Sequence, residues 1–166
     1  MNYEFRLQPV RLPLANAGPI KNGFTLTEFI ITIGIIIILT SIGIPVFRSI
    51  RPSFQLSGTA RNLVTDLHYA QQLAVTEQVD HGVLFSTTTE DKYQIIRHEN
   101  ATTTVLKEEL LPEGIDFQQI SPLSNNEIRF NPYGAAKEEG EITLINTKNS
   151  TTVLDIRPSG FIKIID

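Results

Sequence analysis

Cysteine is absent from this chain of 166 residues, and histidine occurs only three times. Without cysteine, the fold can contain neither disulfide bonds nor thiolate metal sites. His68, His81 and His98 do not form the His-x-x-x-His spacing with which a helix holds a metal ion. The sequence also lacks a Gly-x-Ser-x-Gly segment and a glycine-rich phosphate loop. We therefore expect no catalytic residues, no cofactor and no enzyme activity.

Positive charge is in the minority as well. The chain has 14 Lys and Arg against 18 Asp and Glu, a net charge of −4. An acidic chain argues against broad nucleic-acid binding, because that binding depends on neutralising phosphates. The acidic run Glu138 to Glu141 could supply a few calcium ligands, but a calcium site needs several convergent oxygens. We expect no metal site there and interpret these carboxylates as solvated.

The third absence is local: no charged residue occurs from Phe29 to Ile44. Counted from Phe24, this apolar segment covers roughly 31 Å as a helix, enough to cross the hydrocarbon core of a bilayer. Glu28 lies near its start, and an unpaired ionised carboxylate inside a bilayer costs roughly 2.5–3.5 kcal/mol or more. We therefore expect a partner for Glu28. Residues 1–22 contain no continuous apolar core and so do not form a conventional secretory signal.

The run Lys21 to Glu28, with Gly23, Phe24 and Glu28 ahead of an apolar helix, resembles the type IV prepilin signal. The resemblance implies that a prepilin peptidase in the membrane cuts between Gly23 and Phe24 and methylates the new N-terminus at Phe24. It further implies that Glu28 pairs with the N-terminal amine of a neighbouring subunit and sets its register. The leader would lie in the cytoplasm and the rest outside. The alternative is a plain signal anchor in which Glu28 is incidental.

Helix-breaking residues follow in the apolar segment. Pro45 removes a backbone donor, and Gly43 lies two residues before it, so we expect a helix break at Gly43 and Pro45. The resemblance to prepilins implies a segment that stretches or melts inside a filament. A simple bend where the helix leaves the membrane is the other interpretation.

From Phe54 to Val79 the apolar residues recur every three or four positions, which predicts an amphipathic helix with one buried stripe. We expect the stripe to contain Leu56, Ala60, Leu63, Val64, Leu67, Ala70, Leu73 and Ala74. We expect the solvent-facing side to carry Arg61, Asn62, Asp66, Gln71 and Glu77. Pro52 and Ser53 could begin this helix separately, or the helix could continue from the membrane as one long rod.

The remainder of the sequence predicts short strands separated by turns. Several strands alternate apolar and polar residues, as half-buried strands do, and Pro, Gly and Asn mark the turns between them. We expect strands at 83–85, 93–96, 104–106, 115–117, 127–130, 141–145, 152–156 and 161–165. A helix followed by an antiparallel sheet predicts an α+β domain. The resemblance to prepilins implies that this domain is pilin-like, with the long N-terminal helix packed on an antiparallel β-sheet head.

Two of the turns carry a further pattern. Residues 131–134 and 157–160 both read x-Pro-x-Gly, in which proline fixes φ and glycine accepts a positive φ. With the alanine-rich helix around His68, this pair is similar to the GspH/FimT branch of the prepilin-like proteins. These are minor pseudopilins of type II secretion and minor pilins of type IV pili.

The chain departs from that branch at its end. FimT-like proteins that bind DNA resemble one another in a basic Gly-Arg-x-Arg segment, and the corresponding residues here are Gly160-Phe161-Ile162-Lys163. Only Lys163 is basic, so the resemblance does not carry a DNA-binding role. We expect Lys163 to be a solvated charge on an edge strand, a position where lysine prevents unwanted pairing.

These observations predict a cleaved leader at residues 1–23, a transmembrane and assembly helix at 24–45, an amphipathic helix at 46–79 and a β-rich head at 80–166. The expected protein is a minor subunit of a type II secretion pseudopilus that supports protein secretion. It crosses the inner membrane once, has its head in the periplasm and assembles with other pseudopilins at an inner-membrane platform. The alternatives are a minor type IV pilin, for pilus priming, adhesion or competence, and a membrane-anchored periplasmic binding module that does not polymerise.

Overall fold

The computed structural model describes residues 23–88, 90–99 and 102–165. Of the expected leader, only Gly23 lies within the described residues. The described chain consists of one long α-helix followed by eight strands, with a short 3-10 helix at Ser124–Asn126. The described residues divide into two compact units, one that ends at Ile42 and one that begins at Gly43.

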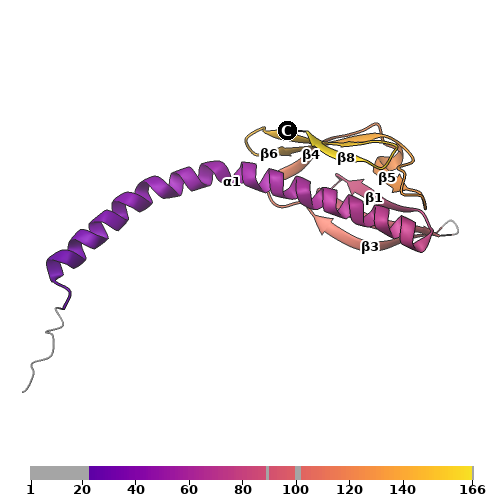
Figure 1. The fold of residues 1–166 in the computed structure, drawn as a ribbon. Helices are drawn as coiled ribbons and strands as arrows, with labels where there is room; N and C mark the ends of the chain where they lie inside the picture. Colours follow the sequence, from indigo (N-terminus) through magenta and orange to yellow (C-terminus); the bar gives the residue numbers. More distant parts are fainter. Residues whose placement is uncertain (1–22, 89, 100–101, 166) are drawn as a thin grey trace, which may run out of the picture. The chain divides into compact units, whose positions relative to one another are not determined.

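The helix α1 spans Leu26–Glu77 and contributes to both units. In the second unit, its C-terminal part lies along the strands (Figure 1). The buried side chains of that part are those of Leu56, Thr59, Ala60, Leu63, Asp66, Leu67, Ala70 and Ala74. The helix ends because Gln78 takes a left-handed φ of 56°, a common helix stop. Its Nε2 donates a hydrogen bond to the Val75 carbonyl oxygen at 2.7 Å.

The prolines do not interrupt α1. The helix continues through Gly43, Pro45 and Pro52, and because a continuous helix can still kink at a proline, the expected helix break at Gly43 and Pro45 stays a prediction. The separate start at Pro52 and Ser53 is wrong, and the single long helix is correct. A proline removes one backbone hydrogen bond but leaves the neighbouring bonds of the ladder intact. A loosening of this segment during assembly stays a prediction.

The first sheet has the strand order β3-β2-β1-β5, and all its neighbours are antiparallel. The register between β2 and β3 shifts between Ile95 and Ile96, where Leu106 of β3 has no opposite residue, as at a β-bulge. The bounds are β1 His81–Ser86, β2 Lys92–Glu99, β3 Thr102–Leu110 and β5 Glu127–Phe130.

The second sheet has the order β4-β6-β7-β8 and is also antiparallel. Its strands are β4 Ile115–Ser121, β6 Gly140–Asn146, β7 Thr151–Ile156 and β8 Ile162–Ile165. In β6 and β7, buried side chains alternate with more exposed ones, so one face of this sheet is covered. The predicted helix-on-sheet fold and the eight predicted strands are confirmed, but the strands form two sheets, since two separate sets of strands each have an apolar face to cover.

One hydrophobic core joins the helix and both sheets. The helix contributes fully buried Leu63 and Leu67, each worth about 1.5–3 kcal/mol of burial. The small, fully buried side chain of Ala70 allows the helix to approach the strands closely. Phe85 of β1 and Phe117 of β4 meet edge to face across the two sheets, with ring centroids 5.5 Å apart. The core therefore fixes the C-terminal part of α1 to the head as one packed body.

Candidate processing and assembly site

Thr25 determines where α1 begins. Its carbonyl oxygen accepts a hydrogen bond from the Phe29 backbone N–H at 3.1 Å, and its Oγ1 accepts one from the Glu28 backbone N–H at 3.1 Å. Thr25 is therefore the N-cap residue, and Glu28 occupies the position three residues later at which a capping box places Glu. A carboxylate in the first turn is also favoured by the positive end of the helix dipole.

The peptide bond between Gly23 and Phe24 lies just outside this helix start. Both residues are non-helical and exposed, and the Phe24 side chain is 68% exposed. A Cβ added to Gly23 would meet nothing within 4 Å. Within the described residues, nothing covers this bond, and it lies two residues before the first helical residue.

Glu28 has no charged neighbour among the described residues. Its side chain is exposed, and among the described residues no cation lies within ion-pair distance of it. The next charged residue along the chain is Arg48, well over 20 Å further along a helix at about 1.5 Å per residue. A carboxylate in this position is available to a partner from outside the described chain.

The hydroxyl groups of the apolar segment are satisfied within the helix. Thr32 Oγ1 donates to the Glu28 carbonyl oxygen at 2.6 Å, Thr40 Oγ1 to the Ile36 carbonyl oxygen at 2.8 Å, and Ser41 Oγ to the Ile38 carbonyl oxygen at 2.8 Å. Such bonds remove the cost of placing a hydroxyl in an apolar medium. The segment is thus compatible with lipid despite these three polar residues.

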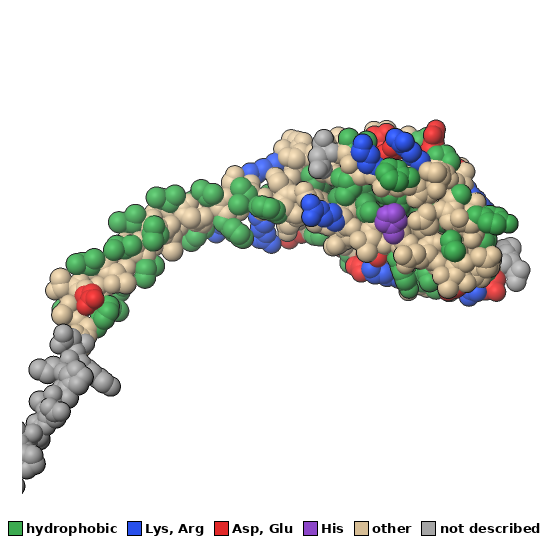
Figure 2. Space-filling view, viewed as in Figure 1, with side chains coloured by type: hydrophobic (Ala, Val, Ile, Leu, Met, Phe, Trp, Pro, Cys, Tyr) green, Lys and Arg blue, Asp and Glu red, His purple; other side chains and the backbone are tan. Residues whose placement is uncertain are grey.

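The surface of this segment is apolar and open. Figure 2 shows its hydrophobic side chains exposed along the helix, with one acidic side chain near the start. By length and composition, α1 is the one helix in the described part of the chain that could cross a membrane, and none of its apolar window is buried. A continuous, exposed apolar surface of this length needs either lipid or other apolar helices to cover it.

In the head, Asp66 of α1 is bonded to two strands of the first sheet. It is only 8% exposed, and its Oδ2 accepts a hydrogen bond from the Tyr93 hydroxyl at 2.7 Å. The Lys107 ammonium donates to both carboxylate oxygens at 2.9 Å. The pKa of Tyr93 is raised above its ordinary value, mainly by burial and also by the hydrogen bond to Asp66. The hydrogen bond to Asp66 also raises the pKa of Lys107.

The prediction that Asp66 faces solvent is therefore wrong. Asp66 lies three residues after Leu63 and four before Ala70, so its spacing matches the edge of the buried stripe. Its charge suggested the polar face, but the spacing was the better signal. The carboxylate can be buried here because Tyr93 and Lys107, which are distant in the sequence, satisfy it.

The two x-Pro-x-Gly turns meet each other at α1. The backbone N–H of Gly134 donates to the Asn131 carbonyl oxygen at 2.9 Å, and that of Gly160 to the Arg157 carbonyl oxygen at 2.8 Å. Both glycines have a positive φ, 81° and 79°, as predicted. Gln71 Nε2 donates to the Gly134 and Gly160 carbonyl oxygens at 2.6 and 3.2 Å. Gln71 was predicted to face solvent, but it joins the helix to both turns.

A charged group also stabilises the edge of the first sheet. Glu127 accepts hydrogen bonds from His98 Nε2 at 2.7 Å and from Arg129 Nε at 2.9 Å. Burial alone would raise the pKa of Glu127, but the hydrogen bonds from Arg129 and His98 outweigh it and lower the pKa below its ordinary value. The bond to Glu127 also raises the pKa of Arg129. His98 is thus a structural partner in this sheet.

Other candidate ligand sites are not assembled. Across the described ranges 23–88, 90–99 and 102–165, no group of three or more Asp, Glu or His side chains is placed to hold a metal ion. Lys163 lies on β8, at the edge of the second sheet, where it is exposed and opposite Asp155. This is the position expected of a solvated edge-strand charge.

Comparison with protein families gives one match. The family model described as "Type II transport protein GspH" matches residues 59–160, which is more than half of the chain. The chain belongs to the GspH family. The matched region contains α1 from Thr59 onward and every strand of the head except β8, including Asp66, Gln71 and both paired turns. No curated protein matches this GspH-family chain in sequence.

Solved structures with the same fold include two minor pilin-like proteins. The type IV minor pilin FimU of Pseudomonas aeruginosa superposes with a TM-score of 0.58 at 15% identity, covering 69% of this chain and 90% of that one. The minor pseudopilin EpsH from the type 2 secretion system of Vibrio cholerae superposes with a TM-score of 0.54 at 12% identity, covering 67% and 96%. The fold is thus that of pilin-like structural subunits, a long helix packed on a two-sheet head.

Proposed function

We propose that this GspH-family chain is a minor pilin-like subunit of a type II secretion pseudopilus, in which it supports protein secretion. In this proposal, a prepilin peptidase cleaves it between Gly23 and Phe24 and methylates Phe24. The subunit is first held in the inner membrane with its head in the periplasm. It is then assembled with other pseudopilins at an inner-membrane platform.

The observation that carries the proposal is the isolation of Glu28. Glu28 is the one charge between Phe24 and Phe47, on a helix whose apolar surface is exposed throughout that segment. Cleavage after Gly23 would create an ammonium group at Phe24, where the positive end of the helix dipole disfavours it. Pairing the ammonium of one subunit with Glu28 of the next removes the cost of the unpaired carboxylate and the cost of the ammonium at the positive helix end. The same pairing fixes the register between the two helices.

The open Gly23–Phe24 bond supports the processing step. The bond is non-helical and exposed within the described residues, so a peptidase can reach it without unfolding α1. The N-cap at Thr25 lies after the cut. Cleavage therefore leaves the start of the helix, including the Thr25–Glu28 bond, intact in the mature subunit.

A second function is favoured by the likeness to FimU. That protein is a type IV minor pilin, and its fold matches this chain at least as well as that of the secretion pseudopilin EpsH. In a pilus, the same helix and the same Glu28 would serve priming, adhesion or competence. Co-purification distinguishes the two: a secretin-associated secretion platform supports the first function, and a pilus major subunit supports the second.

The substitution Glu28→Ala tests the shared assembly step. We expect the variant to insert into the membrane and fold its head, because Glu28 belongs to the first unit and is not among the core residues of the head. It should fail to cross-link with neighbouring pilin-like subunits in the native host, since the neighbour's ammonium loses its partner.

Glu113→Ala is the matched control, because Glu113 is also exposed but lies on the head. The control should assemble at the normal level. Normal assembly of the Glu28→Ala variant would contradict the proposed role of Glu28. An absence of cross-links to pilin-like subunits even in the unchanged chain would favour an anchored binding module that does not polymerise.

A further inference from the structure

Two arginines follow the apolar segment directly. Arg48 and Arg51 are the first charges after Glu28, and both are exposed on α1. Residues three apart on a helix project from the same side, so the two guanidinium groups are neighbours. In the proposed orientation they lie on the outer side of the membrane. There they do not contribute to the positive-inside signal, which acts through cytoplasmic loops.

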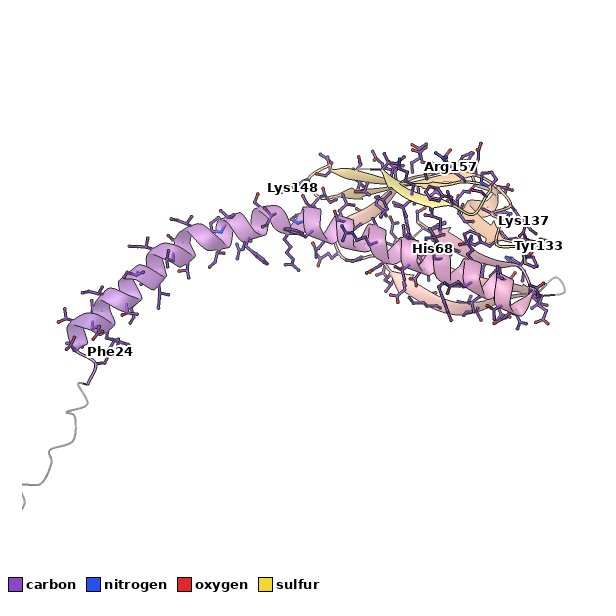
Figure 3. The ribbon with its side chains drawn as sticks, in the orientation of Figure 1. Phe24, His68, Tyr133, Lys137, Lys148 and Arg157 are labelled. Carbon is purple, nitrogen blue, oxygen red and sulfur yellow. The ribbon has the colours of Figure 1, made fainter. Side chains whose placement is uncertain are left out.

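A third cation comes from a distant part of the head. Lys148 lies in the turn between β6 and β7, and Figure 3 shows it beside α1. Its Nζ donates to Ser49 Oγ at 2.9 Å and also contacts the Ser49 carbonyl oxygen. Ser49 lies between the two arginines in the sequence. The fold therefore brings the ammonium of Lys148 to the same turn of helix as Arg48 and Arg51, which together we call the basic cluster.

The basic cluster has no internal counter-charge. Within the described residues, none of its three members forms an ion pair with a carboxylate, although acidic residues outnumber basic ones in the chain as a whole. Three like charges on one turn repel each other, and an external anion relieves that repulsion. Figure 2 shows blue side chains along α1 next to the head, open to solvent.

Apolar side chains lie among these cations. Phe47, Ile50 and Phe54 are exposed by 66%, 44% and 72%, and their spacing of three and four places them along one side of the helix. A helix that combines exposed apolar side chains with arginines is typical of segments that lie at the boundary between headgroups and acyl chains. A purely polar partner would leave the two phenylalanines in water.

We propose that the basic cluster of Arg48, Arg51 and Lys148 binds the phosphate of anionic phospholipid headgroups and so seats the head on the membrane surface before assembly. This inference rests on the proposed function, because it needs residues 24–47 to span the bilayer. As a helix, these residues cover about 35 Å, slightly more than the hydrocarbon core. The cluster begins at the next residue and is therefore at headgroup depth.

The test uses the full chain in phosphatidylcholine vesicles with and without phosphatidylglycerol. Because the chain has no cysteine, Ser150→Cys gives a single labelling site in the exposed turn that carries Lys148. A fluorophore there is quenched by nitroxides on the lipid headgroups. We expect the nitroxide on phosphatidylglycerol to quench more than fivefold more efficiently than the one on phosphatidylcholine, because each cation near an anionic surface supplies a preference of about fivefold.

The substitutions Arg48→Gln, Arg51→Gln and Lys148→Gln together should reduce this preference to about one. Arg48→Gln with Arg51→Gln should lower the preference to about fivefold, the share of the one remaining cation, while leaving the Lys148–Ser49 contact in place. The matched control is Arg61→Gln with Lys163→Gln, which removes two exposed cations outside the cluster and should keep the preference.

Equal quenching by the two lipids in vesicles that carry the protein would overturn the lipid inference and leave the proposed function standing. A preference found only at high protein-to-lipid ratios would also overturn it, because it would assign the cluster to a neighbouring copy. Failure of the protein to co-float with the vesicles would refute the membrane span, and with it both proposals.

Discussion

Replacing Asp66 with alanine removes the acceptor that Tyr93 and Lys107 share. The Tyr93 hydroxyl, in a residue only 5% exposed, then loses its acceptor at 2.7 Å. The Lys107 ammonium loses both of its 2.9 Å bonds to the carboxylate. The perturbation therefore acts on the contact between α1 and the first sheet.

The magnitude follows from these two partners. A buried hydrogen bond to a charged group is worth about 1.5–3 kcal/mol, and an unsatisfied buried hydroxyl costs about 1–3 kcal/mol. The Lys107 side chain is 39% exposed, so water replaces most of its interaction, which leaves at most about 1 kcal/mol. We expect Asp66→Ala to lower the free energy of unfolding of the head by about 2–4 kcal/mol.

Pulse proteolysis in urea measures this loss without relying on a tyrosine signal, and it can be applied to the full chain in detergent. Asp116→Ala, which removes an exposed carboxylate, should change the free energy by less than about 0.5 kcal/mol. Tyr93→Phe should be destabilising in the unchanged chain and much less so in Asp66→Ala, because the hydroxyl then has no partner to lose. A loss below about 1 kcal/mol, or additive effects of the two substitutions, would refute this reasoning.

Two further predictions concern the head. Gln71→Ala should lower the free energy of unfolding by about 1–2 kcal/mol, because both paired turns lose their hydrogen bond to α1. The control Gln72→Ala, at an exposed position, should change it very little. Equal effects of the two substitutions would contradict the role of Gln71 in joining the turns to the helix. Glu127 has a lowered pKa in the folded protein, so its contribution is complete above about pH 4.5 and is lost as the pH falls through the folded pKa. Glu127→Gln should flatten this acid-side loss in urea titrations, whereas Glu139→Gln should leave its slope unchanged.

Local patterns predicted the helix and the turns well because the residue types in each pattern themselves produce the local structure. The three-and-four spacing of Leu63, Leu67 and Ala70 predicted the buried side of the helix, and all three are fully buried. The x-Pro-x-Gly runs predicted turns whose glycines have positive φ, which Gly134 and Gly160 confirm. Here the residue type and the backbone geometry are directly linked.

The contacts between elements could not be predicted in the same way. Asp66 and Gln71 were expected on the solvent side because they are polar, yet their partners lie 27 to 89 residues further along the chain. The local spacing of residues does not predict that the Tyr93 hydroxyl bonds to Asp66, or that both turns bond to Gln71.

The central claim is that the chain is processed at Gly23 and joins a filament through Phe24 and Glu28. The most direct test is the intact mass and N-terminal sequence of the protein extracted from its native membrane, with Gly23→Val as a variant. Gly23 has open space for a side chain, so the variant should fold normally and stay uncut. We predict that the unchanged chain begins at N-methylated Phe24. A chain that is uncut, or cut after the apolar segment, would contradict the account.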